Sequence, residues 1–180
     1  MQKGIIWHKS LDSTNAEVRR QLSELDNLSI VAALTQTAGR GQGDHTWTSE
    51  PGLNLTFTLL RRFPKGAFDV RNLAAINTYV TSVLTHYLAA HGVQAWVKPP
   101  NDIWVGDRKI CGILIENILD GSFVTESIIG IGLDLNQTVW PPELPNPVSL
   151  KELTGKDYSL EKELEALLAL FAATPISGCE

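Results

Sequence analysis

IWVGDRKICGILIENILDGSFVTESIIGIGLDL, residues 103–135, is the stretch that decides the fold. It contains three apolar runs, at residues 103–105, 110–119 and 123–135, separated by the turn pairs Gly106-Asp107 and Asp120-Gly121. Apolar runs joined by short turns that contain glycine are typical of β-hairpins. We therefore predict two successive hairpins in this part of the chain.

Further strands and helices are predicted on both sides of these hairpins. Apolar runs typical of strands lie at residues 5–8, 29–35, 53–59 and 93–97. Residues 53–59 alternate apolar and polar side chains, which predicts a half-buried strand. Apolar residues at helical spacing predict helices at 16–25, 70–91, 149–153 and 160–171, with Gly92 ending the second and Ser159 capping the last.

The order of these elements indicates the fold class. Strands dominate the middle of the chain as hairpins, and helices come before, between and after them. This order predicts an α+β fold: a mixed, mostly antiparallel β-sheet with helices packed on one face. It argues against the regular strand–helix alternation of a doubly wound nucleotide-binding sheet.

Composition limits the class of protein. The 180 residues are 43% hydrophobic and 19% charged, which suits one globular domain. The net charge of −5 gives no general electrostatic support to a nucleic-acid partner. The sequence has no apolar run long enough to span a membrane and no signal peptide at residues 1–5. Cys111 and Cys179 form no metal or redox motif, so we expect a cytoplasmic protein without a membrane partner.

Residues 36–43, QTAGRGQG, follow a predicted strand and form the first candidate site. Three glycines in five residues let backbone amides approach a phosphate, and Arg40 adds a charged donor fork. Glycine spacing alone favours a mobile surface loop instead. The segment matches neither a Rossmann fingerprint nor a P-loop, because no helix and no Gly-Lys-Ser/Thr follow.

A second candidate comprises residues 98–102, KPPND, and residues 107–109, DRK. Asn101 and Asp102 can hold a metal ion or a ribose. Lys109 starts a buried strand, where an ammonium group is costly unless it meets an anion. A proline turn with a charged hairpin tip explains the same residues equally well.

Two further segments are ambiguous when each is taken alone. Glycines within the apolar residues 130–136, GIGLDLN, mark either a close ligand approach or a bulge and tight packing, and the second is the commoner. The polar residues 12–15, DSTN, either cap the helix that follows or face a ligand, and propensity favours the cap.

Taken in order, these motifs resemble the biotin protein ligase family from Ser10 to about Asn136. The order is Asp-Ser-Thr-Asn, Gln-x-Ala-Gly-Arg-Gly-Gln, Trp47, Lys-x-Pro-Asn-Asp, Arg-Lys-x-x-Gly-Ile-Leu-Ile-Glu and Gly-Ile-Gly-x-x-x-Asn. The resemblance implies the catalytic domain of a non-repressor member, with the class II synthetase-like biotin–lipoate ligase fold.

The resemblance also implies an activity. Biotin attacks the α-phosphate of ATP to give biotinyl-5′-AMP and pyrophosphate, with Mg²⁺ as the metal. A lysine of a carboxylase's biotin carboxyl carrier domain then attacks the mixed anhydride and releases AMP. Biotin brings its own carboxylate nucleophile, so the protein must mainly position two anions and offset their repulsion.

The matching positions supply the implied site residues. Biotin contacts fall to Ser13, Thr14, Asn15, Gln36, Arg40, Gly41, Gln42 and Lys109. Nucleotide contacts fall to Gly39, Arg40, Trp47, Asn101, Asp102, Gly132, Asp134 and Asn136. Lys109 and Arg40 are the implied catalytic cations, Asp102 the implied Mg²⁺ ligand, and Trp47 closes over the ligand.

Three positions depart from the family pattern. Pro99 follows the lysine where tryptophan is common, and Gln42 stands where some members carry a second arginine. Asp134 replaces the asparagine of Gly-x-Gly-x-Asn. An aspartate adds charge repulsion near ATP and lacks the amide donor, so it weakens the expectation of adenine binding.

The positions of the chain ends suggest a domain organisation. We expect residues 1–180 to be one catalytic domain truncated at its C-terminus, without an N-terminal helix-turn-helix and without the C-terminal β-barrel domain. DNA binding is therefore not expected. Edge-to-edge pairing of sheets in the family leaves a homodimer open.

Two other functions remain as alternatives. A non-catalytic biotin-binding remnant would account for Asp134 and the short C-terminus. A lipoate or octanoate ligase would share the fold, but those enzymes usually carry a triple glycine and a histidine-aspartate pair. Here the triple glycine is absent and Asp44-His45 has the reverse order.

Overall fold

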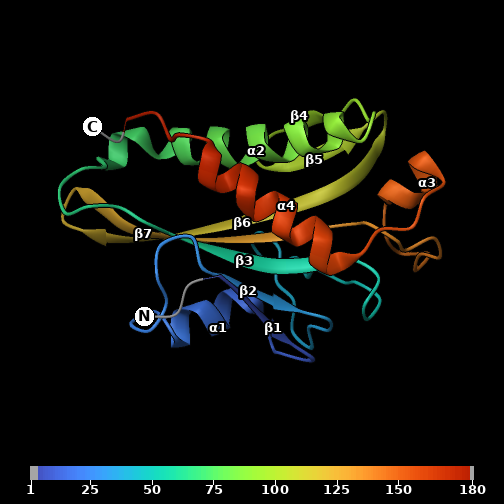
Figure 1. The fold of residues 1–180 in the computed structure, drawn as a ribbon, viewed down its shortest axis with the longest axis horizontal. Coiled ribbons are helices and arrows are strands. Elements are labelled where there is room, and N and C mark those ends of the chain that lie inside the picture. Colours follow the sequence, from blue (N-terminus) through green and yellow to red (C-terminus); the bar gives the residue numbers. More distant parts are fainter. Residues whose placement is uncertain (1–3, 179–180) are drawn as a thin grey trace.

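The computed structural model describes residues 4–178, which form a seven-stranded sheet with helices on both faces (Figure 1). The strand order is β1-β2-β3-β7-β6-β5-β4; β1 and β2 are parallel, and every other neighbouring pair is antiparallel. The strands are β1 (Ile5–His8), β2 (Ile30–Ala33), β3 (Leu55–Arg62), β4 (Trp96–Lys98), β5 (Asp102–Val105), β6 (Arg108–Asp120) and β7 (Phe123–Leu133). The predicted α+β class and the two hairpins are confirmed.

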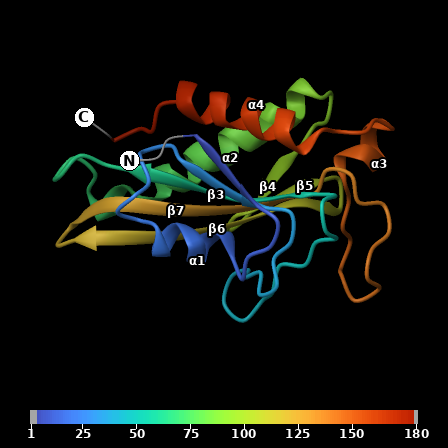
Figure 2. The same cartoon turned by 60° about the horizontal axis from the view of Figure 1, so that its bottom comes forward.

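The helices divide unequally between the two faces of the sheet. They are α1 (Thr14–Arg20), α2 (Leu73–Ala90, after the 3-10 turn Val70–Asn72), α3 (Leu150–Thr154) and α4 (Leu160–Ala173). The two long helices α2 and α4 cover one face, and α1 lies on the other (Figure 2). Helices on one face were predicted, and the structure adds α1 to the second face. Val18 of α1 packs there against Val31, Leu60 and Ile128.

The second helical layer explains why β3 differs from its prediction. A half-buried strand was expected, but residues 55–60 are all buried because both faces of β3 are covered. The polar positions are satisfied within the protein: Thr56 Oγ1 donates to the Ala33 carbonyl at 2.9 Å. Alternation of polar and apolar residues therefore marks a polar buried face here, not an exposed one.

Two element boundaries also differ from their predictions. The helix predicted at 16–25 begins at Thr14 and ends at Arg20, yet Leu25 stays fully buried beyond its end. The strand predicted at 93–97 lies at Trp96–Lys98, while Val93 packs into the core ahead of it. In both cases apolar residues beside the element are buried by tertiary contacts. A periodicity argument wrongly assigns these residues to the element itself. No helix within residues 4–178 is long and apolar enough to cross a membrane.

Two tyrosines of α2 tie it to α4. Tyr87 Oη donates to Glu163 Oε2 at 2.6 Å, and Tyr79 Oη donates to the Phe171 carbonyl at 2.6 Å. Burial raises the pKa of Tyr79 to about 12, and burial together with the Glu163 hydrogen bond raises the pKa of Tyr87 further. Both phenols are therefore neutral donors, one to a carboxylate and one to a carbonyl.

The different acceptors give a stability prediction. Tyr87→Phe should lower the free energy of unfolding by about 1.5–3 kcal/mol, because a hydrogen bond to a charged group is lost. Tyr79→Phe is the matched control on the same helix and should cost about 0.5–1.5 kcal/mol. Urea denaturation of both variants measures the difference, and an equal or larger loss for Tyr79→Phe would contradict it.

Candidate active site

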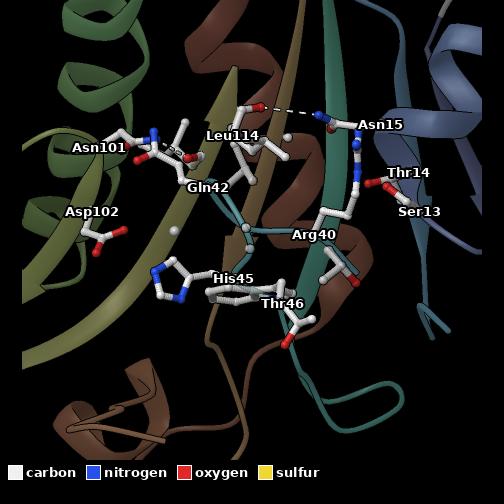
Figure 3. A pocket seen from close by; sticks show the side chains of 18 of the residues that line it. Ser13, Thr14, Asn15, Arg40, Gln42, His45, Thr46, Asn101, Asp102 and Leu114 are labelled. Atoms are coloured by element: carbon white, nitrogen blue, oxygen red, sulfur yellow. Dashed lines mark hydrogen bonds between the residues drawn. The ribbon is translucent and has the colours of Figure 1, made fainter. Parts of the chain in front are cut away.

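A cavity of about 290 Å³ lies on the α1 side of the sheet, between β6, β7 and the loop that follows β2 (Figure 3). Most of the site residues predicted from sequence line it. They are Ser13, Thr14, Asn15, Gln36, Arg40, Gly41, Gln42, Trp47, Asn101, Asp102, Lys109 and Gly132. Segments far apart in the sequence therefore meet in one place, as the motif order predicts, while their individual roles stay predictions.

Three predicted residues lie elsewhere. Gly39 belongs to the glycine loop but lines neither cavity, and Asp134 lines a second cavity beside the first. Asn136 lines neither cavity: its Nδ2 donates to the Tyr158 carbonyl at 2.8 Å, and its Oδ1 accepts from the Tyr158 N–H at 2.9 Å. Both polar atoms of the Asn136 side-chain amide thus hold the chain ahead of α4. In this arrangement the amide does not reach a ligand in either cavity.

Gly132 keeps the cavity floor bare. It pairs with Thr56 of β3 and Gly112 of β6 in an unbroken ladder, so no bulge explains the glycine. A Cβ at Gly132 would lie 2.1 Å from the Trp47 ring, and a Cβ at Gly112 would lie 2.9 Å from it. The close approach of an aromatic side chain, rather than local backbone irregularity, therefore requires glycine at these positions.

Gly130 leaves space for the Asn15 side chain in the same way. A Cβ there would lie 2.3 Å from Asn15 Oδ1. Between the two glycines, Ile131 points to the opposite face and joins the main hydrophobic core. The alternation of glycine with large apolar residues thus gives β7 one face for the core and one for the site.

The start of α1 presents polar groups to the cavity. Ser13 occupies the N-cap position but makes no side-chain capping bond, and it lines the cavity. Gln36 Oε1 accepts from the Thr14 N–H at 2.8 Å and from Thr14 Oγ1 at 3.2 Å. The Thr58 hydroxyl lies 2.8 Å from Thr14 Oγ1 and 2.6 Å from Asn15 Oδ1. This cluster is a fixed set of donors and acceptors, which a plain helix cap does not explain.

Glu116 of β6 connects α1 to the glycine loop and was given no role from sequence. Its Oε2 accepts from Asn15 Nδ2 at 3.0 Å, and its Oε1 accepts from Arg40 Nη2 at 3.1 Å. Arg19 Nη2 lies 3.6 Å from the same Oε1. Asn15 also donates to the Leu114 carbonyl at 3.4 Å (Figure 3). The sequence signal was a single carboxylate within the apolar run 110–119.

The glycine loop folds back on itself. The Trp47 N–H donates to the Gly39 carbonyl at 3.0 Å, and the Gly41 N–H donates to the His45 carbonyl at 2.8 Å. A Cβ at Gly39 would lie 2.4 Å from the Trp47 carbonyl oxygen, so this glycine permits the return of the loop. The Gly41 amide is engaged within the loop in this conformation. It can meet a phosphate only after the contact with His45 opens.

Lys109 stands between the two cavities and lines both. Its Nζ lies 2.8 Å from Asp102 Oδ1 and 5.8 Å from the centroid of the Trp47 ring. The anion that a lysine at the start of a buried strand needs is therefore Asp102 in this structure. The indole Nε1 of Trp47 is buried without a hydrogen-bond partner among the residues described, 4–178.

The second cavity, of about 570 Å³, shares His45, Thr46, Trp47, Asp102 and Lys109 with the first. Its remaining wall is mostly flat and apolar: Trp104, Trp140, Leu144 and three prolines, Pro141, Pro145 and Pro147. The tryptophans at 104 and 140 and these prolines were not predicted as site residues. Trp104 lies on β5, whereas Trp140 and the prolines belong to the long connector between β7 and α3, which has no periodic pattern to interpret.

The bare floor at Gly132 gives a direct test of the position of Trp47. Gly132→Ala should displace the Trp47 ring, cost about 1–3 kcal/mol of stability, and make Trp47 fluorescence more accessible to acrylamide. Gly130→Ala, on the same strand and face, meets Asn15 instead and is the control. Each variant is compared with its Trp47→Phe counterpart. Equal quenching of Trp47 in both glycine variants would contradict the geometry.

Comparison with known proteins gives the family. Residues 7–134 match the biotin/lipoate A/B protein ligase family. The biotin–[acetyl-CoA-carboxylase] ligase of Paracoccus denitrificans is 30% identical over 165 residues, covering 89% of this chain and 68% of that protein. The bifunctional ligase/repressor BirA of Bacillus subtilis strain 168 is 30% identical over 181 residues, covering 95% of this chain and 53% of that protein. The chain thus spans about half the length of the second relative.

Solved structures of biotin protein ligases share this fold. The structure of biotin protein ligase from Aquifex aeolicus in complex with biotin and ATP matches with a TM-score of 0.80 at 26% identity, covering 95% of this chain and 69% of that one. The expected biotin–lipoate ligase fold and the resemblance to biotin protein ligases are therefore confirmed. The chain belongs to the biotin/lipoate A/B protein ligase family.

Proposed function

We propose that this chain is an ATP-dependent biotin protein ligase. It joins the biotin carboxylate to the α-phosphate of ATP with loss of pyrophosphate, and passes biotin to a lysine of a carboxylase's biotin carboxyl carrier domain with loss of AMP. The observation that carries the proposal is a pair of adjoining cavities with Lys109 on their shared wall. Two substrates can lie in them with their reacting ends at the same cation.

Biotin fits the first cavity. The ureido ring offers N–H donors and a carbonyl acceptor, and Ser13, Thr14, Asn15 and Gln36 supply matching groups. The dithiolane ring of lipoate has neither kind of group, so it would make none of these hydrogen bonds. The polar cluster therefore favours biotin over lipoate or octanoate as the substrate.

The reacting ends meet at Lys109. The carboxylate of biotin and the α-phosphate of ATP repel each other, and the ammonium of Lys109 bridges them and stabilises the charge that builds up in transfer. To do so it exchanges its contact with Asp102 for the substrates. Arg40, with Gly41 and Gln42, closes the glycine loop over the adenylate and excludes water from the mixed anhydride.

The second cavity takes the nucleotide, with Trp47, Asp102 and Asp134 around it, while the Gly132 backbone lies on the floor of the adjoining first cavity. Mg²⁺ usually binds through one or two carboxylates together with substrate phosphates. Asp102 is one such carboxylate, and within the described residues 4–178 there is no cluster of three or more acidic, histidine or cysteine ligands. Asp102 would hold a Mg²⁺ ion that arrives with ATP, and that ion would neutralise phosphate charge. Asn101 supports this turn by donating through Nδ2 to the Ile113 carbonyl.

Loss of Lys109 tests the proposal. With ATP, Mg²⁺ and biotin, Lys109→Ala should lower biotinyl-AMP formation by about 10²–10³-fold, because a preorganised charge at the reacting centre is removed. Lys98→Ala is the matched control, since Lys98 Nζ lies 3.7 Å from the Trp104 ring centroid and lines neither cavity. Mass spectrometry of an added carrier domain measures the transfer. Pyrophosphate release that needs no biotin, or that persists in Lys109→Ala, would sink the proposal.

A second pair of variants isolates the cation of the glycine loop. Arg40 and Arg19 both pair with Glu116, but only Arg40 lines the cavity. Arg40→Ala should lower biotinyl-AMP formation by about 10²-fold or more, because Gln42 leaves the loop without a second arginine. Arg19→Ala removes a Glu116 contact without removing the cavity cation and should keep the wild-type rate. Similar losses in both variants would instead assign the effect to Glu116.

A further inference from the structure

Asp134 directly follows β7 and is an unpaired carboxyl group on the wall of the second cavity. The residue is 4% exposed, and its Oδ1 is buried without a hydrogen-bond partner among residues 4–178. Its backbone is fixed: the N–H donates to the Ile110 carbonyl at 3.0 Å, and the carbonyl accepts from the Leu150 N–H at 2.9 Å. The backbone of Asp134 is thus held in place, and its side chain has a polar atom that makes no hydrogen bond within residues 4–178.

The charges around Asp134 do not supply an ion pair. Lys109 of β6 is the cation that acts on Asp134, and it lies in an ion pair with Asp102. Cys111 of β6 is buried and neutral, and Glu152 of α3 adds negative charge. Burial raises the pKa of Asp134 well above its ordinary value of 3.8; Lys109 opposes the shift and Glu152 adds to it. The cavity wall also carries His45, Asp102 and Glu143.

The walls beside Asp134 suit a flat aromatic ring. Trp47, Trp104 and Trp140 line the same cavity as Asp134, together with three prolines. Aromatic side chains bind a nucleobase through its π-face, and that contact is indifferent to which base it is. Choice between bases therefore has to come from a polar group at the ring edge. Among residues 4–178, the buried polar side-chain atoms of this wall without a partner are Asp134 Oδ1 and the indole Nε1 atoms of Trp47 and Trp104. An indole N–H can only donate, so the carboxyl group of Asp134 is the one that can distinguish bases by both donating and accepting.

We propose that Asp134 selects adenine as a neutral carboxylic acid, donating through its hydroxyl and accepting through its carbonyl oxygen. The inference rests on the proposed function, because ATP is the nucleotide in question. Adenine presents an N6 amino donor beside a ring-nitrogen acceptor. A protonated carboxyl has one donor and one acceptor, like the amide of asparagine, whereas a carboxylate has acceptors only. An ionised Asp134 would match two adjacent donors, as on guanine.

The test is nucleotide binding as a function of pH. ATP, GTP and 2′-deoxy-ATP are titrated by calorimetry into the whole chain and into Asp134→Asn, from about pH 6 to about pH 9, where deeply buried carboxyls titrate. Wild-type affinity for ATP, divided by that of Asp134→Asn, should fall with rising pH by up to about tenfold per unit. The ratio cancels the pH dependence of every group that both proteins share.

Comparison of the three nucleotides shows which part of the nucleotide Asp134 recognises. As pH rises, the affinity of the wild type for GTP should increase relative to its affinity for ATP. Asp134→Asn should show no such change in relative affinity. The result for 2′-deoxy-ATP should match ATP, because the ribose hydroxyl takes no part. An affinity ratio that is constant with pH, that rises with pH, or that loses its pH dependence with 2′-deoxy-ATP overturns the proposal.

Two further readouts separate the possible failures. Biotinyl-AMP formation is measured in the same samples. If biotinyl-AMP forms but the ratio of the two ATP affinities is constant with pH, only the role of Asp134 is overturned. If no biotinyl-AMP forms but the ratio falls with pH as expected, only the proposed ligase activity is overturned. Urea unfolding gives a readout without nucleotide. Because the pKa of Asp134 is raised in the folded protein, its stabilisation is present below about pH 3.8 and is lost as pH rises through the folded pKa. Wild-type stability relative to Asp134→Asn should therefore decline with pH, and a flat difference contradicts a buried neutral acid.

Discussion

The absence of side chains on one face of two adjacent strands is the constraint on which the site depends. Gly112 of β6 and Gly130 and Gly132 of β7 leave the centre of the sheet bare on the α1 side. Asn15 and the Trp47 ring occupy the space that Cβ atoms would fill. Without these glycines neither α1 nor the glycine loop could approach the sheet, and the cavity between them would lose its present shape.

The same strand must also support the core, and its alternation allows both. Ile129, Ile131 and Leu133 of β7 point away from the site and pack in the main core with α2 and α4. Because side chains alternate between faces, a shift of one residue in register would put the isoleucines into the cavity and the glycines into the core. Burial of these apolar residues therefore fixes the register, and the register fixes the site.

The sequence could predict whatever depends on local pattern. The hairpins and the long helix α2 follow from spacing along the chain, and the meeting of the motifs follows from what the resemblance to biotin protein ligases implies. Contacts that depend on the three-dimensional arrangement of side chains and layers could not be predicted: α1 on the second face, the pairing of Lys109 with Asp102, and the use of Asn136 to hold Tyr158. Periodicity assigns a residue to an element, but it does not reveal which side chains meet.

Glu116 explains how one site can be rigid at one end and mobile at the other. It holds Asn15 through a hydrogen bond in which Asn15 is 3% exposed, so the polar cluster at α1 is fixed before a ligand binds. It holds Arg40 through a pair whose arginine side chain is 54% exposed. Exposed ion pairs contribute about 0–1 kcal/mol, so a phosphate can displace Glu116 from Arg40 at little cost. The carboxylate therefore keeps the loop near the site in the absence of ligand without opposing its closure.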